Sequence, residues 1–210
     1  MNVHFKVLLV VYAMMISVVH AAEVSCSKSC QTPFGTVNGQ SFLTQAYSNC
    51  SSSCVKHDRH YISLPNVQEP IFTGMKWQCV EYARRWLIEN KGVTFGEVEY
   101  AYHIWDLPHA ELVGTHQYVP LLRFKNKVSK EPPQVGDLLI NSVQLAVTGH
   151  VAVVVGVEPD SITIAEQNYF NRSWEGKDYA RRLLLDKDER GRYRVVDDAL
   201  IGWVRVVPSS

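Results

Sequence analysis

The stretch from Lys76 to Gly92, KWQCVEYARRWLIENKG, constrains the fold of this chain most. Apolar side chains recur in it three and four residues apart, which is the spacing of a helix that buries one face. The pattern ends at a lysine followed by Gly92, and glycine readily takes the left-handed conformation that terminates a helix. We therefore predict a helix over residues 77–90, with Arg84 and Arg85 lying off its apolar stripe.

Cys79 lies at the N-terminal end of this predicted helix. Free backbone N–H groups and the positive end of the helix dipole favour a thiolate there, which lowers the thiol pKa and makes the sulfur nucleophilic near neutral pH. The alternative is that Cys79 is a small buried apolar residue, which is the commoner role of a free cysteine.

The other cysteines bear on this choice. The chain has five cysteines, and the four others form two CxxxC pairs, Cys26 with Cys30 and Cys50 with Cys54. Cysteines of secreted chains usually pair as disulfides, so an odd number leaves one over. We predict two disulfides among the first four, with their pairing left open. The thiol left over is then Cys79, which favours its role as a nucleophile.

The N-terminus has the pattern of a secretory signal peptide. Lys6 is followed by a mostly apolar run at residues 7–19 and then by His20-Ala21-Ala22. This run is too short to cross a bilayer, which takes about 20 apolar residues, and no later stretch comes close. We expect residues 1–21 to be removed, with cleavage after Ala21 or Ala22. The protein is then secreted or endolysosomal/vacuolar, or periplasmic in a bacterial host.

Composition predicts one ordinary domain after this leader. Apolar residues make up 46% of the chain, which is enough for a packed core. Residues 22–75 are rich in Ser, Asn, Gly and Pro, so we expect an irregular, disulfide-bearing segment of the same domain as residues 76–210. The chain has 21 basic and 21 acidic side chains. This balance supports neither a nucleic-acid nor a membrane-surface partner.

Strands are predicted mainly in the second half. A run of β-branched residues marks 150–157 as a strand buried on both faces. A short strand is expected before it at 138–140, and two more after it at 162–168 and 201–207. A second helix is predicted over 95–107. One early helix packed on an antiparallel sheet gives an α+β domain.

The turn centred near Pro159 makes a prediction about side-chain positions. Residues equidistant from a hairpin turn lie opposite each other, so His150 and Asn168 are expected as cross-strand neighbours. Side chains alternate along a strand, so Glu166 is expected diagonally opposite the histidine, whereas Gln167 points to the other face. With the free thiol, these residues supply what nucleophilic amide cleavage needs: a nucleophile, an imidazole and a polar group that orients it. The sequence therefore predicts a cysteine hydrolase, with ordinary structural roles for the three residues as the alternative.

Three segments also carry a resemblance to a known family: WQCVEYARRWL at 77–87, TGHVAVV at 148–154 and IAEQN at 164–168. They resemble the thiol amidase domain of bifunctional glutathionylspermidine and trypanothione synthetase/amidases. That domain belongs to the CHAP superfamily of cysteine- and histidine-dependent amidohydrolases and peptidases, which also includes D-alanyl-glycyl endopeptidases. The similarity extends from Pro33 to Trp203, which is nearly all of the chain after the leader.

The resemblance implies a papain-like α+β fold in which the N-terminal helix carries the nucleophile. Cys79 is then the nucleophile, and His150 is the general base and acid. Either Glu166 or Asn168 orients the imidazole, because the amidase relatives favour the asparagine position and the endopeptidase relatives favour the glutamate. Gln78 matches the residue whose side chain forms the oxyanion hole with the Cys79 backbone N–H, and a helix-capping amide is its alternative role.

The compartment and the endopeptidase relatives together predict a secreted cysteine amidohydrolase that cleaves a peptide amide bond through an acyl-thioester intermediate. Peptidoglycan-type peptides are the expected substrates, because a secreted enzyme would meet little cytosolic thiol–polyamine conjugate. A glutathionylspermidine-type amidase and a catalytically inactive peptide- or glycan-binding protein are the alternatives.

Two further patterns carry weaker signals. His57 and His60 form an isolated HxxH pair, which we interpret as part of a solvated loop, so neither a metal nor another cofactor is expected. The sequences Asn49-Cys50-Ser51 and Asn171-Arg172-Ser173 match the pattern of N-glycosylation sites.

Overall fold

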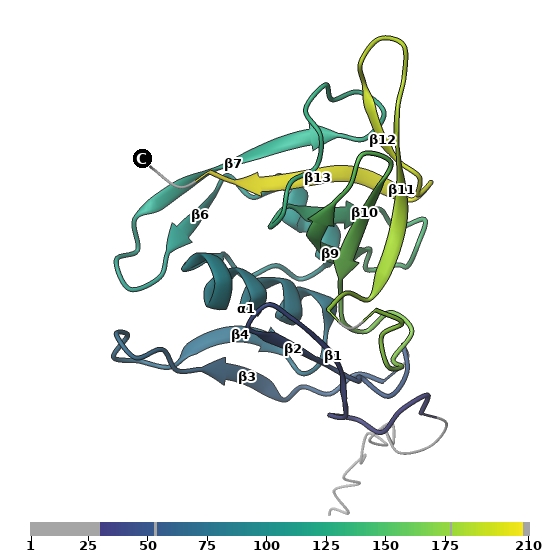
Figure 1. Cartoon of the computed structure of the whole chain (residues 1–210). Helices are drawn as coiled ribbons and strands as arrows, with labels where there is room; N and C mark the ends of the chain where they lie inside the picture. The colour runs from purple at the N-terminus through teal and green to yellow at the C-terminus, as the bar shows by residue number, and fades with distance from the viewer. Residues whose placement is uncertain (1–29, 53, 177, 208–210) are drawn as a thin grey trace, which may run out of the picture.

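The computed structural model describes residues 30–52, 54–176 and 178–207, so the predicted signal peptide and Cys26 lie outside the described residues. Within these ranges one α-helix, α1 (Cys79–Lys91), lies against a large antiparallel sheet (Figure 1). This is the mixed α+β architecture predicted from the sequence. None of the described helices is long and apolar enough to span a membrane.

The large sheet has nine strands in the order β12-β11-β10-β9-β8-β13-β7-β6-β5. Their bounds are β5 (Val93–Phe95), β6 (His109–Leu112), β7 (Tyr118–Lys125), β8 (Leu138–Asn141), β9 (His150–Val157), β10 (Ser161–Ala165), β11 (Arg181–Lys187), β12 (Tyr193–Val195) and β13 (Leu200–Val206). Two small sheets pair β1 (Val37–Ser41) with β2 (Thr44–Tyr47) and β3 (Arg59–Ile62) with β4 (Ile71–Met75). The small sheets lie on the side of α1 opposite the large sheet, so the helix is enclosed between them (Figure 1).

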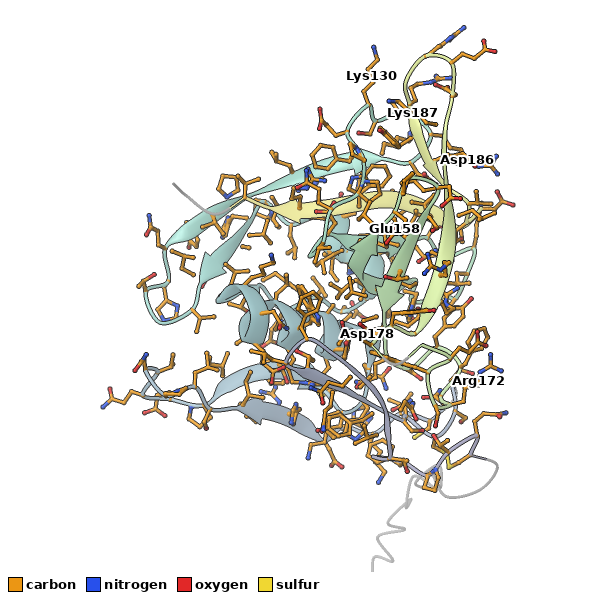
Figure 2. All side chains as sticks on the ribbon, in the orientation of Figure 1. Lys130, Glu158, Arg172, Asp178, Asp186 and Lys187 are labelled. Atoms are coloured by element: carbon orange, nitrogen blue, oxygen red, sulfur yellow. A yellow bond between two sulfur atoms is a disulfide. The ribbon has the colours of Figure 1, made fainter. Side chains whose placement is uncertain are left out.

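Strand β9 lies in the core and is buried on both faces, as predicted. Val151 and Val153 pack in the same cluster as Trp86 of α1, whereas Ala152 and Val154 belong to a second cluster. Because side chains alternate along a strand, these two clusters lie on opposite faces of the sheet. Figure 2 shows charged side chains such as Asp186 and Lys187 at the far end of the sheet, away from α1. Other charged groups, such as Glu81, Arg84 and Arg85, are instead buried on the helix itself.

The C-terminal end of α1 follows from the sequence, whereas the helix starts two residues later than the predicted residue 77. The helix begins at Cys79, with Gln78 as its N-cap residue in an extended conformation. It ends at Gly92, whose φ of 65° is left-handed and whose N–H donates to the carbonyl oxygens of Leu87 and Ile88. The Gln78 side chain makes no capping hydrogen bond, so the capping alternative does not describe it.

The face of α1 that lies off the predicted apolar stripe is buried as well. Arg84 and Arg85 are each only 3% exposed. Arg84 donates to three backbone carbonyls, and Arg85 pairs with Glu81 one turn earlier. Strand β4 passes so close to the helix that a Cβ at Gly74 would lie 2.9 Å from the Glu81 Cα. The arginines are buried because the small sheets, which the sequence did not predict, cover this face.

In other parts of the chain, the sequence predicted which residues are buried more accurately than it predicted the backbone conformation. The strand starting at 162 ends at Ala165 and not at Asn168. The helix predicted over 95–107 is wrong, because β5 ends at residue 95 and a short 3-10 helix, η1 (Ala101–Asp106), follows. Its apolar residues still pack on the core. Residues 37–75, expected to be irregular, contain β1 to β4, whose short, partly polar sequences lack the β-branched run that marks a buried strand.

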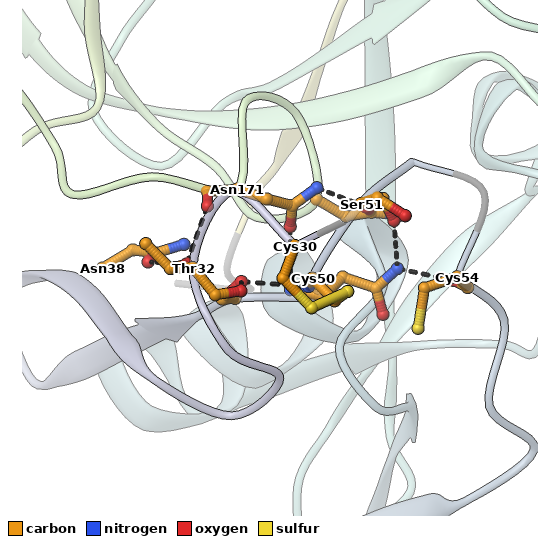
Figure 3. The surroundings of a disulfide bond; sticks show 10 residues. Cys30, Thr32, Asn38, Cys50, Ser51, Cys54 and Asn171 are labelled. Carbon is orange, nitrogen blue, oxygen red and sulfur yellow. Dashed lines mark hydrogen bonds between the residues drawn. A yellow bond between two sulfur atoms is a disulfide. The ribbon is translucent and has the colours of Figure 1, made fainter. Parts of the chain in front are cut away.

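A disulfide joins Cys30 to Cys50 in the N-terminal segment, and Figure 3 shows its surroundings. Cys54 is also disulfide-bonded. Within the described part of the chain, Cys79 is the free cysteine.

Candidate active site

The side chains of Cys79 and His150 interact, because each shifts the pKa of the other. Cys79 is the first residue of α1 and His150 is the first residue of β9, so the pair joins the helix start to the core strand. The cysteine is partly exposed, whereas the histidine is only 4% exposed. The thiol can therefore meet a substrate while its partner imidazole is shielded from water.

Gly149 explains how β9 can begin at this point. Its φ of 65° lies in the left-handed region, which glycine adopts without penalty. A Cβ there would lie 2.6 Å from the carbonyl oxygen of Asn141 and 3.1 Å from the Cβ of Tyr102. A larger residue would push β9 away from β8 and η1, and the imidazole would move with it.

Glu166 holds the other side of the imidazole. The Nε2 of His150 lies 2.8 Å from Glu166 Oε2, which leaves Nδ1 as the ring nitrogen for the thiol. Glu166 also accepts two hydrogen bonds from Arg181. The Nε of Arg181 lies 2.5 Å from Oε1 of Glu166, and a terminal nitrogen of Arg181 lies 3.0 Å from Oε2. The Arg181 guanidinium lies 4.0 Å from the ring centroid of Tyr169, which fixes its position further. With Cys79 ionised and His150 protonated, the sign of the charge alternates from Cys79 through His150 and Glu166 to Arg181.

The electrostatics of the pair favour separated charges. Burial raises the pKa of the Cys79 thiol, but the charge and hydrogen bond of His150, with two backbone N–H groups, bring it below its ordinary value. Burial lowers the pKa of His150, but Cys79 and Glu166 raise it above the ordinary imidazole value. Burial likewise raises the pKa of Glu166, yet His150 and Arg181 hold it below that of a free carboxyl group. These opposite shifts favour a thiolate–imidazolium pair near neutral pH.

The Asn168 side chain is hydrogen-bonded to Gln78. The ladder between β9 and β10 stops at Ala165, so the pairing predicted from the turn does not continue to Asn168, whose φ of 57° is left-handed. Its Nδ2 donates to Gln78 Oε1 at 2.9 Å. The expected cross-strand contact with His150 is therefore replaced by the diagonal contact from Glu166.

Gln167 points away from His150, as predicted, and ties this segment to the helix start. Its Nε2 donates to the backbone carbonyl of Gln78 at 3.2 Å and to Glu81 Oε2 at 2.9 Å. Its Oε1 accepts the backbone N–H of Tyr47 at 2.7 Å. Residues 166–168 thus contact the histidine, the helix start and the Gln78 side chain in turn.

Glu81 lies buried beneath the start of α1. Burial raises its pKa, but a hydrogen bond from His60 and the charge of Arg85 lower it to about 2, so the group is ionised. His60 Nδ1 lies 2.9 Å from Glu81 Oε1. The interpretation of His60 as part of a solvated loop is wrong, because it belongs to β3 and contacts this carboxylate. The described residues hold no group of three or more His, Cys, Asp or Glu side chains arranged for a metal.

A cleft of about 190 Å³ opens beside the thiol, and both Gln78 and Cys79 line it. Its walls also include the carboxylates Glu81, Glu97 and Glu99, the guanidinium of Arg84 and the aromatic ring of Tyr100. This space fits a short part of a substrate. The carboxylates outnumber the one guanidinium in these walls.

Comparison with known proteins bears on this geometry. Residues 71–168 match the CHAP domain family. Over this stretch the chain is similar to a CHAP domain. It is 33% identical over 189 residues to trypanothione synthetase of Crithidia fasciculata and 32% identical over 184 residues to the bifunctional glutathionylspermidine synthetase/amidase of Escherichia coli. These matches cover 86% and 82% of this chain but only 28% and 29% of the two relatives, so the chain spans less than a third of their length. Together, the domain and the relatives support an amidase of the CHAP type.

The CHAP match includes Cys79, His150 and Glu166, but it ends before Arg181. Arg181 is a residue that sequence reasoning missed. The signal that could have found it is the pairing of β10 with β11, which places Arg181 opposite Ile164, two residues from Glu166. Because β11 has only a short apolar pattern, the sequence did not predict that strand.

Proposed function

We propose that this protein is a cysteine amidase that hydrolyses a peptide-type amide bond through an acyl-thioester intermediate. The observation that carries the proposal is the partly exposed Cys79, which lines the cleft and whose interaction with His150 shifts the two pKa values in opposite directions. The contact of His150 with Glu166 supports it, because an oriented imidazole is what acid–base catalysis needs. The arrangement of helix nucleophile and strand base is papain-like, and that likeness is part of the proposal.

In this mechanism the Cys79 thiolate attacks the carbonyl carbon, and the carbonyl electrons move to the oxygen. The Cys79 backbone N–H and Gln78 Nε2 donate to that oxyanion. The His150 imidazolium gives its proton to the amide nitrogen as the C–N bond breaks, which leaves an acyl-thioester and a free amine. Water then attacks the thioester while His150 accepts its proton, and the carboxylic acid leaves with the thiolate restored. Glu166 holds the imidazole throughout.

We propose peptidoglycan-type stem or cross-bridge peptides as the first substrate class. The predicted signal peptide supports this choice, and a disulfide between Cys30 and Cys50 is consistent with an oxidising compartment such as the cell exterior, an endolysosome or a periplasm. A second class, conjugates of the glutathionylspermidine type, is favoured by one observation. Glu97 and Glu99 line the cleft beside Cys79 and would attract the positive charge of a polyamine.

The test is hydrolysis by the mature protein, with Cys79→Ala as its control. Muropeptides and glutathionylspermidine are incubated with each protein, and newly formed amine termini are counted. We expect release from muropeptides by the wild type only. Release from glutathionylspermidine alone would reverse the order of the two substrate classes. No release from either, together with slow alkylation of Cys79 by iodoacetamide below pH 7, would favour a binding protein and overturn the proposed function.

A further inference from the structure

Three asparagines connect the Gln78 side chain to the disulfide-bearing segment. Asn168 Nδ2 donates to Gln78 Oε1 at 2.9 Å, and Asn171 Nδ2 donates to Asn168 Oδ1 at 3.2 Å. The backbone N–H of Asn49 donates to Asn171 Oδ1 at 2.7 Å. Gln78 Nε2 closes the ring on Asn49 Oδ1 at 3.3 Å. We call these four residues, Gln78, Asn168, Asn171 and Asn49, the amide relay.

The relay has a direction, because it starts from a group that can only donate. A carboxamide has a donor end and an acceptor end, and which is which must be assigned from its partners. The Asn49 backbone N–H requires the oxygen of Asn171, so the nitrogen of Asn171 faces Asn168. The oxygen of Asn168 therefore accepts, and its nitrogen faces Gln78. Gln78 must then present its oxygen to the relay, which fixes its Nε2 as the donor end.

A second backbone N–H group fixes which end of the Asn49 carboxamide is the acceptor. The N–H of Trp77 donates to Asn49 Oδ1 at 3.2 Å, so the nitrogen of that side chain points the other way. There it donates to the carbonyl oxygens of Ser51 at 3.1 Å and Cys54 at 2.6 Å. The Gln78 Nε2 carries two hydrogens, and Asn49 takes one of them. The other remains for a group in the cleft that Gln78 lines with Cys79.

The far part of the relay is built into the core of the N-terminal segment. Asn49 is 0% exposed and Asn171 is 4% exposed. The next residue after Asn49 is Cys50, whose disulfide to Cys30 anchors the segment, and Asn171 lies beside that bond in Figure 3. Asn168 and Asn171 have φ values of 57° and 52°, a left-handed conformation that asparagine tolerates better than most residues. Both sequon nitrogens are engaged as donors here, so the folded chain leaves no room for a glycan on either.

We propose that Asn168, Asn171 and Asn49 are positioning residues that hold the Gln78 carboxamide with Nε2 toward the oxyanion. Asn168 then acts through Gln78 and not through His150. The inference rests on the proposed function, in which an oxyanion forms. Without the donor from Asn168, the Gln78 carboxamide is free to turn over, and its oxygen would repel the oxyanion that its nitrogen stabilises.

The first test compares two reactions of Asn168→Ala. Hydrolysis forms an oxyanion, whereas alkylation of Cys79 by iodoacetamide does not. We expect kcat/KM for amide hydrolysis to fall roughly tenfold or more, but by less than the roughly 100- to 1,000-fold that loss of an oxyanion donor causes. The alkylation rate and its pH dependence should stay at their wild-type values. A fall in alkylation, or a shift of its pH profile, would mean that Asn168 acts through His150, which overturns the proposal.

A double variant tests the route directly. In a Gln78→Ala background, Asn168→Ala should cause little further loss, because its target is gone. Losses that multiply would contradict the relay. Asn168→Asp should be worse than Asn168→Ala, since a carboxylate only accepts and would turn the Gln78 carboxamide over. The matched control is Asn90→Ala at the other end of α1, where Nδ2 donates to Trp86 and Thr44, and its hydrolysis should equal that of the wild type.

The relay and the proposed function fail in different ways. If the wild type hydrolyses no amide, the proposed function fails, and the relay is judged from the mobility of the Gln78 side-chain amide measured by ¹⁵N NMR relaxation. The relay requires an ordered Gln78 amide in the wild type and a more mobile one in Asn168→Ala. Equal mobility in the two proteins would reject the relay whatever the activity is.

Discussion

Two rows of side chains converge on the start of α1, and they differ in kind. The charged row comprises Cys79, His150, Glu166 and Arg181, and the pKa of each of these groups is shifted by its neighbours. The amide relay, Gln78, Asn168, Asn171 and Asn49, contains no titratable group. The difference separates two tasks. Changes in the charged row should alter the pH dependence of the reaction, whereas changes in the relay should alter its rate at every pH alike.

The two rows meet in residues 166–168, which read Glu-Gln-Asn. Glu166 contacts His150, Asn168 contacts the Gln78 side chain, and Gln167 between them holds the Gln78 backbone. A single short segment therefore sets the position of both rows. A shift of one residue in its register would remove both contacts together.

The largest effect is expected from Cys79→Ala, which removes the end of the charged row. Hydrolysis should fall to the rate measured without protein, because no other group can form the acyl intermediate. The fold should be retained, since alanine is a good helix former and the thiol makes no disulfide. Turnover and the thermal unfolding midpoint are measured side by side. Residual turnover near that of the wild type would show that the nucleophile is elsewhere.

Glu166→Gln should lower kcat/KM by roughly 100-fold, the lower range of what acid–base catalysis contributes. The carboxylate helps to raise the pKa of His150, so its loss should also move the alkaline limb of the pH profile to lower pH. A relay variant such as Asn168→Ala should leave that limb in place. Glu158→Gln, on the exposed turn between β9 and β10, is the matched control. An unmoved alkaline limb would remove Glu166 from the charged row.

The pH dependence of wild-type hydrolysis distinguishes the ionisation of Cys79 from that of His150. Hydrolysis should rise through the pKa of Cys79, below that of an ordinary thiol, and fall through that of His150, above that of an ordinary imidazole. Each limb should change the rate by about tenfold per pH unit. Alkylation should rise with the first limb and not fall with the second, because thiolate persists when the imidazolium loses its proton. A fall of both reactions at high pH would point to unfolding instead.

How far the sequence predicted this site depends on the kind of contact. The strand at 150–157 and the end of α1 at Gly92 follow from local patterns, and the diagonal contact of Glu166 with His150 follows from strand alternation. Asn168 was assigned to the wrong neighbour because β10 ends three residues before it. Where β10 ends depends on the contacts of the loop that follows it, and a local sequence pattern does not contain those contacts.

The N-terminal part shows the limit more clearly. Asn49 matched a glycosylation pattern, yet it is buried and joins the relay to Gln78. Arg85 was placed off the buried stripe, yet it pairs with Glu81 beneath the small sheets. Both side chains are polar, and their burial depends on partners 29 to 122 residues away in the chain. Hydrophobic periodicity carries no information about such partners.

The smallest effect on catalysis is expected at Glu81, which supports the helix start without belonging to either row. Its pKa of about 2, against 4.5 for a free carboxyl group, means that its ionised form stabilises the fold. That stabilisation, on the order of 3 kcal/mol, is present above pH 4.5 and is lost as the pH falls toward 2. Glu81→Gln should therefore lower the free energy of unfolding at pH 7, and the gap to the wild type should narrow as the pH falls. The limbs of its pH–rate profile should stay in place. A gap that is constant with pH would show that packing of this side chain, and not its charge, holds the start of α1.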